Sequence, residues 1–127
     1  MAEVMFAIAM MFALPAFGHH SFAAEFDDSR GLVLEGTLTR LDWTNPHVWV
    51  YLDSKDDKGT LVKWRCESGA PNTLRRDGWS KDSFKLGSAL VVTGWPAKDG
   101  SKTCNVRSIK RPDGTSIYSR SPNHSGQ

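Results

Sequence analysis

The chain has no excess of either charge. Sixteen Lys and Arg stand against 14 Asp and Glu among 127 residues, which gives a formal net charge of +2. Nucleic-acid-binding domains usually carry a large and clustered basic excess, so this balance predicts no nucleic-acid partner. With 39% hydrophobic and 24% charged residues, the chain is neither a disordered polymer nor a polytopic membrane protein. Its length allows one compact domain with a single core.

The common signatures of catalysis are also missing. The sequence contains no GxSxG, P-loop, HExxH or CxxC motif. Ser21 follows His20 directly, but the sequence identifies neither a base for this serine nor an oxyanion site. We therefore predict that the protein is not an enzyme and assign it no certain cofactor.

Long apolar runs are missing except at the N-terminus, where eleven apolar residues extend from Val4 to Leu14. A helix of this length spans roughly 17 Å, which is too short for a hydrocarbon core of about 30 Å. Ala16 and Gly18 place small residues three positions and one position before a cleavage point after Gly18, as in a signal peptide. The sequence therefore predicts a signal peptide over residues 1–18.

Export follows from this prediction. The mature chain would begin at His19, lie in the periplasm or outside the cell, and have no permanent insertion in a membrane. Glu3 stands where a signal peptide normally has Lys or Arg. The alternatives are a buried N-terminal helix, or a start codon assigned too far downstream.

Beyond the N-terminus, hydrophobic alternation divides the chain into short strands separated by Gly, Pro and Asp turns. A long curved strand starts at Leu32, bends near Gly36 and changes phase before Leu41. Further strands are predicted over residues 47–53, 61–67, 88–95 and 103–110, with a helix at 71–76 and a short extension at 116–118.

This order, β-β-β-α-β-β, is that of the five-stranded OB barrel. We expect an all-β fold with one short helix: an OB-like barrel over residues 32–118, preceded by an N-terminal extension at 19–31 and followed by a flexible tail at 119–127. Another small half-open barrel is the alternative.

Four stretches of the sequence resemble a family of short exported bacterial proteins of unknown function. They are HHSFAAEFD (19–27), LDWTNPHVWVYLD (41–53), ESGAPNTLRRDGW (67–79) and GWPAKDGSKTCNVRSIKRPDG (94–114). The WTNPHVW stretch with HHSF upstream is the specific pair. The resemblance covers nearly all of the predicted mature chain, implies a periplasmic domain and supplies no activity.

Three histidines form a candidate metal site. At a mature N-terminus, His19 would offer an α-amine and an imidazole, a chelate suited to Cu(II), and His20 would add a second ring. His47, on a predicted strand, is the candidate ligand from the fold. Candidate oxygen ligands are Glu25, Asp27 and Asp28. The simpler alternative is that His19 and His20 form a solvated chain end and that His47 hydrogen-bonds the turn at Asn45.

Aromatic and basic residues form a second candidate site. OB barrels bind ligands across their second and third strands, with aromatic rings as stacking platforms. The candidate groove, suited to a small anionic or sugar-like ligand, consists of Trp43, Trp49, Tyr51, Lys63 and Arg65. The alternative, which we favour, is that residues 22–26 fold back and bury Trp49 and Tyr51.

The two cysteines, Cys66 and Cys104, are subject to opposing arguments. An oxidising periplasm favours a disulfide, and closing a loop of about 39 residues would stabilise the fold by roughly 4 kcal/mol. In an OB barrel, however, the third and fifth strands run parallel, and pairing without an offset would separate the two residues by roughly 16 Å. We predict no disulfide, with Cys66 as a core-facing thiol in phase with Val62 and Trp64.

Taken together, these features predict a small exported binding or accessory protein. Its ligand is either a metal ion, with copper the best candidate, or a small molecule. The alternative is a structural or interaction domain that docks on another envelope protein, with no ligand chemistry at the histidines.

Overall fold

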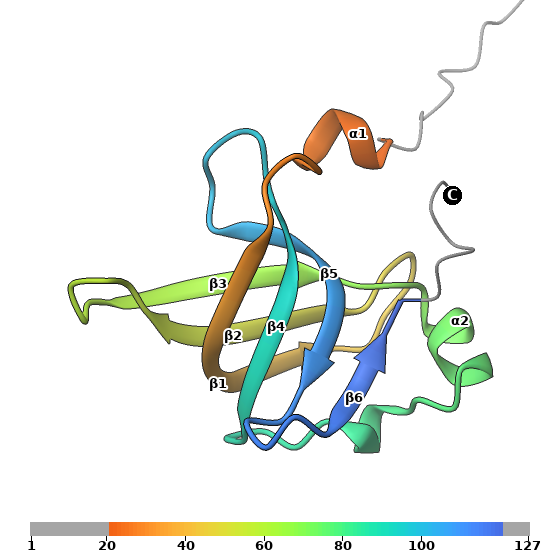
Figure 1. The fold of residues 1–127 in the computed structure, drawn as a ribbon. Coiled ribbons are helices and arrows are strands. Elements are labelled where there is room, and N and C mark those ends of the chain that lie inside the picture. The colour runs from red at the N-terminus through yellow and green to blue at the C-terminus, as the bar shows by residue number, and fades with distance from the viewer. Residues whose placement is uncertain (1–20, 121–127) are drawn as a thin grey trace, which may run out of the picture.

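The computed structural model describes residues 21–120, which form a β-barrel with short helices at its periphery (Figure 1). In chain order, the elements are α1 (Phe22–Glu25), β1 (Leu32–Asp42), β2 (Trp49–Lys55), β3 (Leu61–Glu67), α2 (Pro71–Arg76), the 3-10 helix η1 (Lys81–Ser83), β4 (Ala89–Pro96), β5 (Thr103–Lys110) and β6 (Ser116–Ser119). None of the helices in this part of the chain is long and apolar enough to cross a membrane.

Strand β1 is shared by two parts of the sheet. Its first half pairs with β4 and its second half with β2, both antiparallel. The pairing with β2 is shifted between Leu38 and Arg40, so the predicted change of phase is confirmed but the bulge lies beyond Gly36. Gly36 has another role, because a Cβ atom there would lie 2.6 Å from the carbonyl oxygen of Asp53. Glycine thus allows β1 and β2 to approach closely.

The barrel closes through a short parallel pairing. The sheet order is β3-β2-β1-β4-β5-β6, and β3 also pairs with β5. Arg65, Cys66 and Glu67 of β3 lie opposite Thr103, Cys104 and Asn105 of β5. A closed five-stranded barrel with a helix between its third and fourth strands is the OB architecture that the sequence predicts. Strand β6 adds a short sixth strand along the far part of β5.

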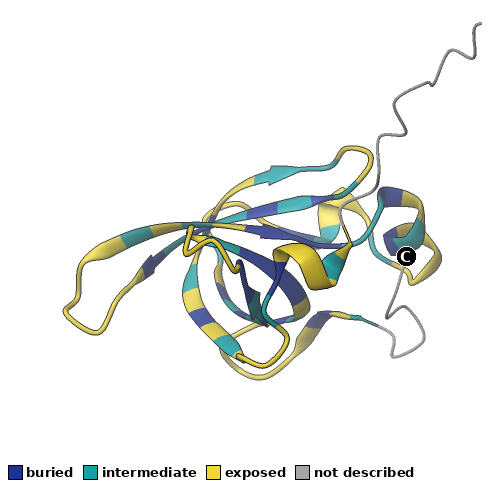
Figure 2. Ribbon diagram, turned by 90° about the horizontal axis from the view of Figure 1, so that it is seen from above, coloured by how far each residue is buried: buried dark blue, intermediate teal, exposed yellow. Residues whose placement is uncertain are grey.

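Alternating side chains from the strands fill the barrel. Along β2 and β4, buried residues alternate with more exposed ones, a pattern that Figure 2 shows along the ribbon. Burial of this alternating set explains why the sequence identifies these strands. The fully buried side chains include Leu38, Val50, Leu52, Leu90, Val92, Val106 and Ile109.

The bounds of β3, α2 and β5 agree with the sequence prediction. Helix α2 starts with Pro71, whose missing N–H is not needed in the first turn. It ends at Arg76, and Gly78, two residues beyond, has φ of 87°. There, the Gly78 N–H donates to the Arg75 carbonyl and the Trp79 N–H donates to the Leu74 carbonyl. This pair of bonds is a Schellman motif, which favours glycine.

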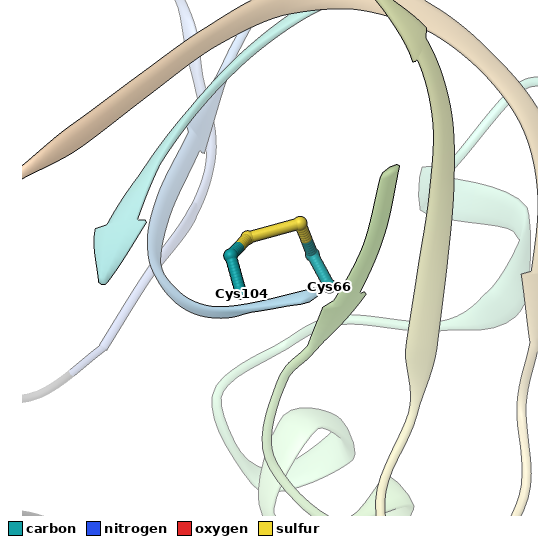
Figure 3. Close-up of a disulfide and its surroundings, with 2 residues drawn as sticks. All are labelled: Cys66 and Cys104. Carbon is teal, nitrogen blue, oxygen red and sulfur yellow. A yellow bond between two sulfur atoms is a disulfide. The ribbon is translucent and has the colours of Figure 1, made fainter. Parts of the chain in front are cut away.

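Cys66 and Cys104 are bridged, so the prediction of two free thiols is wrong (Figure 3). Their Cα atoms are 4.5 Å apart, and both side chains are fully buried. The prediction assumed that β3 and β5 pair without offset. In the barrel, the end of β3 instead pairs with the start of β5, which places the two cysteines directly opposite each other. Cys66 does face the core, as predicted, but as half of a bridge.

The N-terminal segment folds back, but not onto the residues expected. Phe22 packs edge-on against Trp95, with ring centroids 5.3 Å apart, and buried Phe26 pairs with Ala97 in an isolated bridge. The Lys98 ammonium group donates to the carbonyl oxygen of Ala23. The segment is therefore anchored to the end of β4 and the β4–β5 loop. This follows from connectivity, since the segment leads into β1, which pairs with β4.

Removing the bridge should destabilise the protein. It joins residues 38 positions apart, and loss of a native disulfide from a small domain typically costs about 2–5 kcal/mol. We expect a double variant, Cys66→Ala with Cys104→Ala, to unfold at a lower urea concentration, measured by tryptophan fluorescence.

Thiol alkylation provides the control. Native protein that is denatured without reductant should gain no mass on treatment with iodoacetamide, whereas reduced protein should gain two adducts. Two adducts without reductant would contradict the bridge.

Candidate functional site

His47 lies where the β2–β3 pairing continues past the regular strands. The Val48 N–H donates to the Gly69 carbonyl, and both the N–H and the hydroxyl of Ser68 donate to the Val48 carbonyl. These bonds hold the segment before β2 against the segment after β3. As a result, the imidazole Nδ1 of His47 contacts the carboxylate oxygen Oε1 of Glu67 in an ion pair.

Glu67 is the buried member of this pair. Its side chain is 12% exposed, against 40% for His47. Burial raises the pKa of the Glu67 carboxyl above its usual value, and the charge of Glu25 raises it further. The His47 ring and a hydrogen bond with Asn105 act in the opposite direction and lower that pKa. Glu67 is therefore a carboxyl whose charge is costly and depends on its partners.

We call the hollow beside this pair the histidine cleft. It has a volume of about 260 Å³ and lies between α1, the ends of β3 and β6, and the start of α2. Its lining residues are Phe22, Glu25, Phe26, His47, Glu67, Ser68, Gly69, Ala70, Thr73, Arg76, Asp77, Asn105, Tyr118 and Arg120. The lining combines aromatic rings with both signs of charge, so it suits a small polar ligand or an ion.

The predicted metal ligands are only partly placed. His19 and His20 lie outside the described residues. Glu25 lines the histidine cleft with His47, but Asp27 lines neither this cleft nor the groove described below. Asp27 instead accepts hydrogen bonds from the N–H and the hydroxyl of Ser29. Within residues 21–120, no group of three or more His, Cys, Asp and Glu side chains is arranged to hold a metal ion.

Most charges on the outer face of β1, β2 and β3 are already paired. Arg40 donates two hydrogen bonds of 2.7 Å to Asp42, which also accepts one from the Tyr51 hydroxyl. The Arg40 guanidinium covers the Tyr51 ring at 4.8 Å. Lys63 pairs with Asp53 at 3.1 Å. Tyr51 and Lys63 are therefore engaged by neighbours on the sheet rather than directed into a hollow.

Trp49 and Arg65 form the floor of a second hollow, which we call the arginine groove. The Arg65 guanidinium lies 3.8 Å from the centre of the Trp49 ring. The groove has a volume of about 770 Å³. It is lined by Ala24, Glu25, Phe26, Trp49, Arg65, Glu67, Ala97, Lys98, Asp99, Ser101 and Thr103. Two of the five predicted groove residues thus lie together in one hollow.

Trp43 does not belong to this groove. Its ring packs against Phe84, with centroids 6.4 Å apart, and against the hydrophobic core. The guanidinium of Arg75, which is on α2, lies 6.0 Å from the centre of the Trp43 ring. Trp43 therefore faces the chain segment after α2 and the core rather than the groove.

Glu67, Asn105 and Arg120 are among the polar residues of the histidine cleft that the sequence analysis did not identify. Glu67 could have been found, because it alternates in phase with Lys63 and Arg65 on the face that carries His47. Asn105 follows a buried cysteine and gives no such signal. Arg120 was assigned to the tail, yet its N–H donates to the Arg107 carbonyl and its guanidinium donates to Asn105 Oδ1. The predicted tail therefore includes two residues that belong to the barrel domain.

The chain matches the model of one protein family over most of its length. A model of a family of unknown function, DUF6152, matches residues 7–106. The chain belongs to this family. The match agrees with the predicted resemblance to an uncharacterised family, and the barrel is consistent with a small binding or interaction domain. A search of curated proteins found no match.

This DUF6152 chain is also similar to a solved structure. It is the mitochondrial single-stranded DNA binding protein Rim1 of S. cerevisiae, with 8% identity and a TM-score of 0.48. The alignment covers 64% of this chain and 91% of that chain. The prediction of partners excluded nucleic acid on the balance of charge and on export, and this finding corrects that exclusion. The likeness concerns the fold, and it does not identify what this chain binds.

Replacing Glu67 with Gln should change how stability depends on pH. Because the folded-state pKa of Glu67 is raised, the folded protein holds this proton more tightly than the unfolded chain. The free energy of unfolding therefore falls as pH rises from about 4.5 through the folded-state pKa. Gln does not titrate, so the unfolding free energy of Glu67→Gln, relative to the native protein, should increase with pH across this window.

Urea unfolding between about pH 4 and pH 8 measures this difference. Glu35→Gln, on an exposed position of β1, is the matched control and should show no such trend. If the difference in unfolding free energy between Glu67→Gln and the native protein stays constant or decreases with pH, burial does not raise the pKa of the Glu67 carboxyl.

Proposed function

We propose that this chain is an exported binding module for a metal ion, with Cu(II) the best fit, and that His47 is the ligand supplied by the barrel. The observation that carries the proposal is the contact between His47 Nδ1 and the buried Glu67 carboxylate. Histidines that bind metals commonly engage a carboxylate through their other ring nitrogen, which sets the orientation and tautomer of the ring. In this arrangement, His47 Nε2 is the nitrogen that binds the metal, and Glu67 is a positioning residue.

The remaining ligands would come from the mature N-terminus. Helix α1 begins at Phe22, which lines the same cleft as His47. His20 is two residues earlier in the chain, and two residues reach at most about 7 Å. This tether supports a site in which the α-amine and imidazole of His19, with the ring of His20, join His47. Amine and imidazole nitrogens are donors that Cu(II) prefers.

Export is part of the proposal, because the α-amine ligand exists only after cleavage behind Gly18. We expect the intact mass of protein recovered from the periplasm to correspond to a chain that begins at His19. A chain with Ala16→Lys, which lacks the small residue three positions before the cut, should keep its N-terminal segment. Recovery of the native protein with residues 1–18 attached would remove the amine ligand.

Copper binding is tested by calorimetry on the mature protein. His47→Gln should weaken Cu(II) binding about tenfold or more, and acetylation of the His19 α-amine should abolish the amine chelate. Glu67→Gln should bind more weakly and alter the electron paramagnetic resonance spectrum of the bound Cu(II), because the imidazole is no longer held by a carboxylate.

The fourth histidine of the chain, His124, provides the matched control. His124→Gln should bind Cu(II) as the native protein does. Native affinity in both His47→Gln and the N-terminally acetylated protein would overturn the proposal.

A further inference from the structure

We propose that the arginine groove binds a small oxyanion, a carboxylate or phosphate group of low charge, through the guanidinium of Arg65. Three basic residues surround Tyr51 on the outer face of the sheet: Arg40, Lys63 and Arg65. Arg40 is paired with Asp42, and Lys63 is paired with Asp53. Among residues 21–120, Arg65 has no such carboxylate within ion-pair distance, although it is exposed.

The Trp49 ring holds Arg65 in place. The guanidinium carbon lies 3.8 Å from the centre of the ring, a distance at which the two planes are in contact. Stacking occupies a face of the guanidinium and leaves the N–H donors along its edge. These donors form a planar fork that matches the two oxygens of a carboxylate or phosphate. Because the ring already orders the side chain, less rotamer freedom is lost when an anion binds.

Another wall of the groove comes from the β4–β5 loop and the start of β5, with Lys98, Asp99, Ser101 and Thr103 in the lining. Lys98, on the same wall, is tied to α1 through its hydrogen bond to the Ala23 carbonyl and keeps a positive charge there. The volume of about 770 Å³ is that of a small-molecule site.

Three carboxylates also line the groove, those of Glu25, Glu67 and Asp99. Asp99 accepts a hydrogen bond of 2.9 Å from the Ser101 N–H, and Glu67 contacts His47. The third, Glu25, lies on the wall that the groove shares with the histidine cleft. Its negative charge disfavours a polyanion more than an ion with one charge. The groove therefore favours an anion of low charge.

The test is a nuclear magnetic resonance titration of ¹⁵N-labelled, metal-free protein with sodium acetate and, separately, with inorganic phosphate. Saturable shifts should appear at the Arg65 Nε–H and at the Trp49 indole N–H, which a Trp49→Phe spectrum assigns. Comparing the two affinities tells which oxyanion the groove prefers. Glucose and a short single-stranded oligonucleotide should cause no shifts at these two groups.

Variants of two neighbouring basic residues make the test specific. Arg65→Gln should weaken binding of the preferred anion about tenfold or more, because charged hydrogen bonds are lost. Lys63→Gln is the matched control, because Lys63 is on the same strand and face but is paired with Asp53. This variant should bind the anion as tightly as the native protein does. Arg65→Lys keeps the positive charge but lacks the planar fork of N–H donors. Its affinity for the anion should lie between that of the native protein and that of Arg65→Gln.

The proposal is overturned if neither anion causes saturable shifts, or if Arg65→Gln and Lys63→Gln reduce binding equally. Tighter binding of glucose or of the oligonucleotide would also overturn it, because the ligand class would differ. The inference does not rest on metal binding at the histidine cleft. His47→Gln should bind the anion as the native protein does, so the two proposals can fail separately.

Discussion

The pairing of β3 with β5 is the contact on which the rest of this structure depends. It consists of three residue pairs, and the middle pair is the Cys66–Cys104 bridge. Without this pairing, the sheet would be open between β3 and β5 and its inner side chains would lose their cover. The next residue along each strand, Glu67 and Asn105, lines the histidine cleft. Closure of the barrel and placement of the cleft residues therefore result from the same few backbone contacts.

Burial and charge pairing divide the surface into two kinds of region. On the middle of the outer sheet face, Arg40 with Asp42 and Lys63 with Asp53 neutralise one another. Exposed pairs of this kind add little stability, but they leave few charges for a ligand. At the end of the barrel near α1, side chains of both signs line the two hollows instead. The polar chemistry of the protein is thus concentrated where the strands end.

The elements that local sequence could predict are those with local causes. The alternation of hydrophobic and polar residues predicted the residue ranges of β3 and β5. Proline at the start and glycine after the end predicted the range of α2. The bridge could not be predicted in this way, because the offset between β3 and β5 is set by closure of the whole barrel. The same holds for the contact of His47 with Glu67, which depends on how β2 and β3 pair. Trp43 was misplaced because its ring packs against Phe84, a long-range contact that alternation within one strand does not show.

Helix α1 forms a wall common to both hollows. Glu25 and Phe26 line the histidine cleft and the arginine groove alike, as does Glu67 from β3. A substitution at any of these three positions alters both hollows together, so its effects on two ligands would be correlated. His47 lines only the cleft and Arg65 lines only the groove. Variation at those two positions can therefore change one binding property of the barrel while preserving the other.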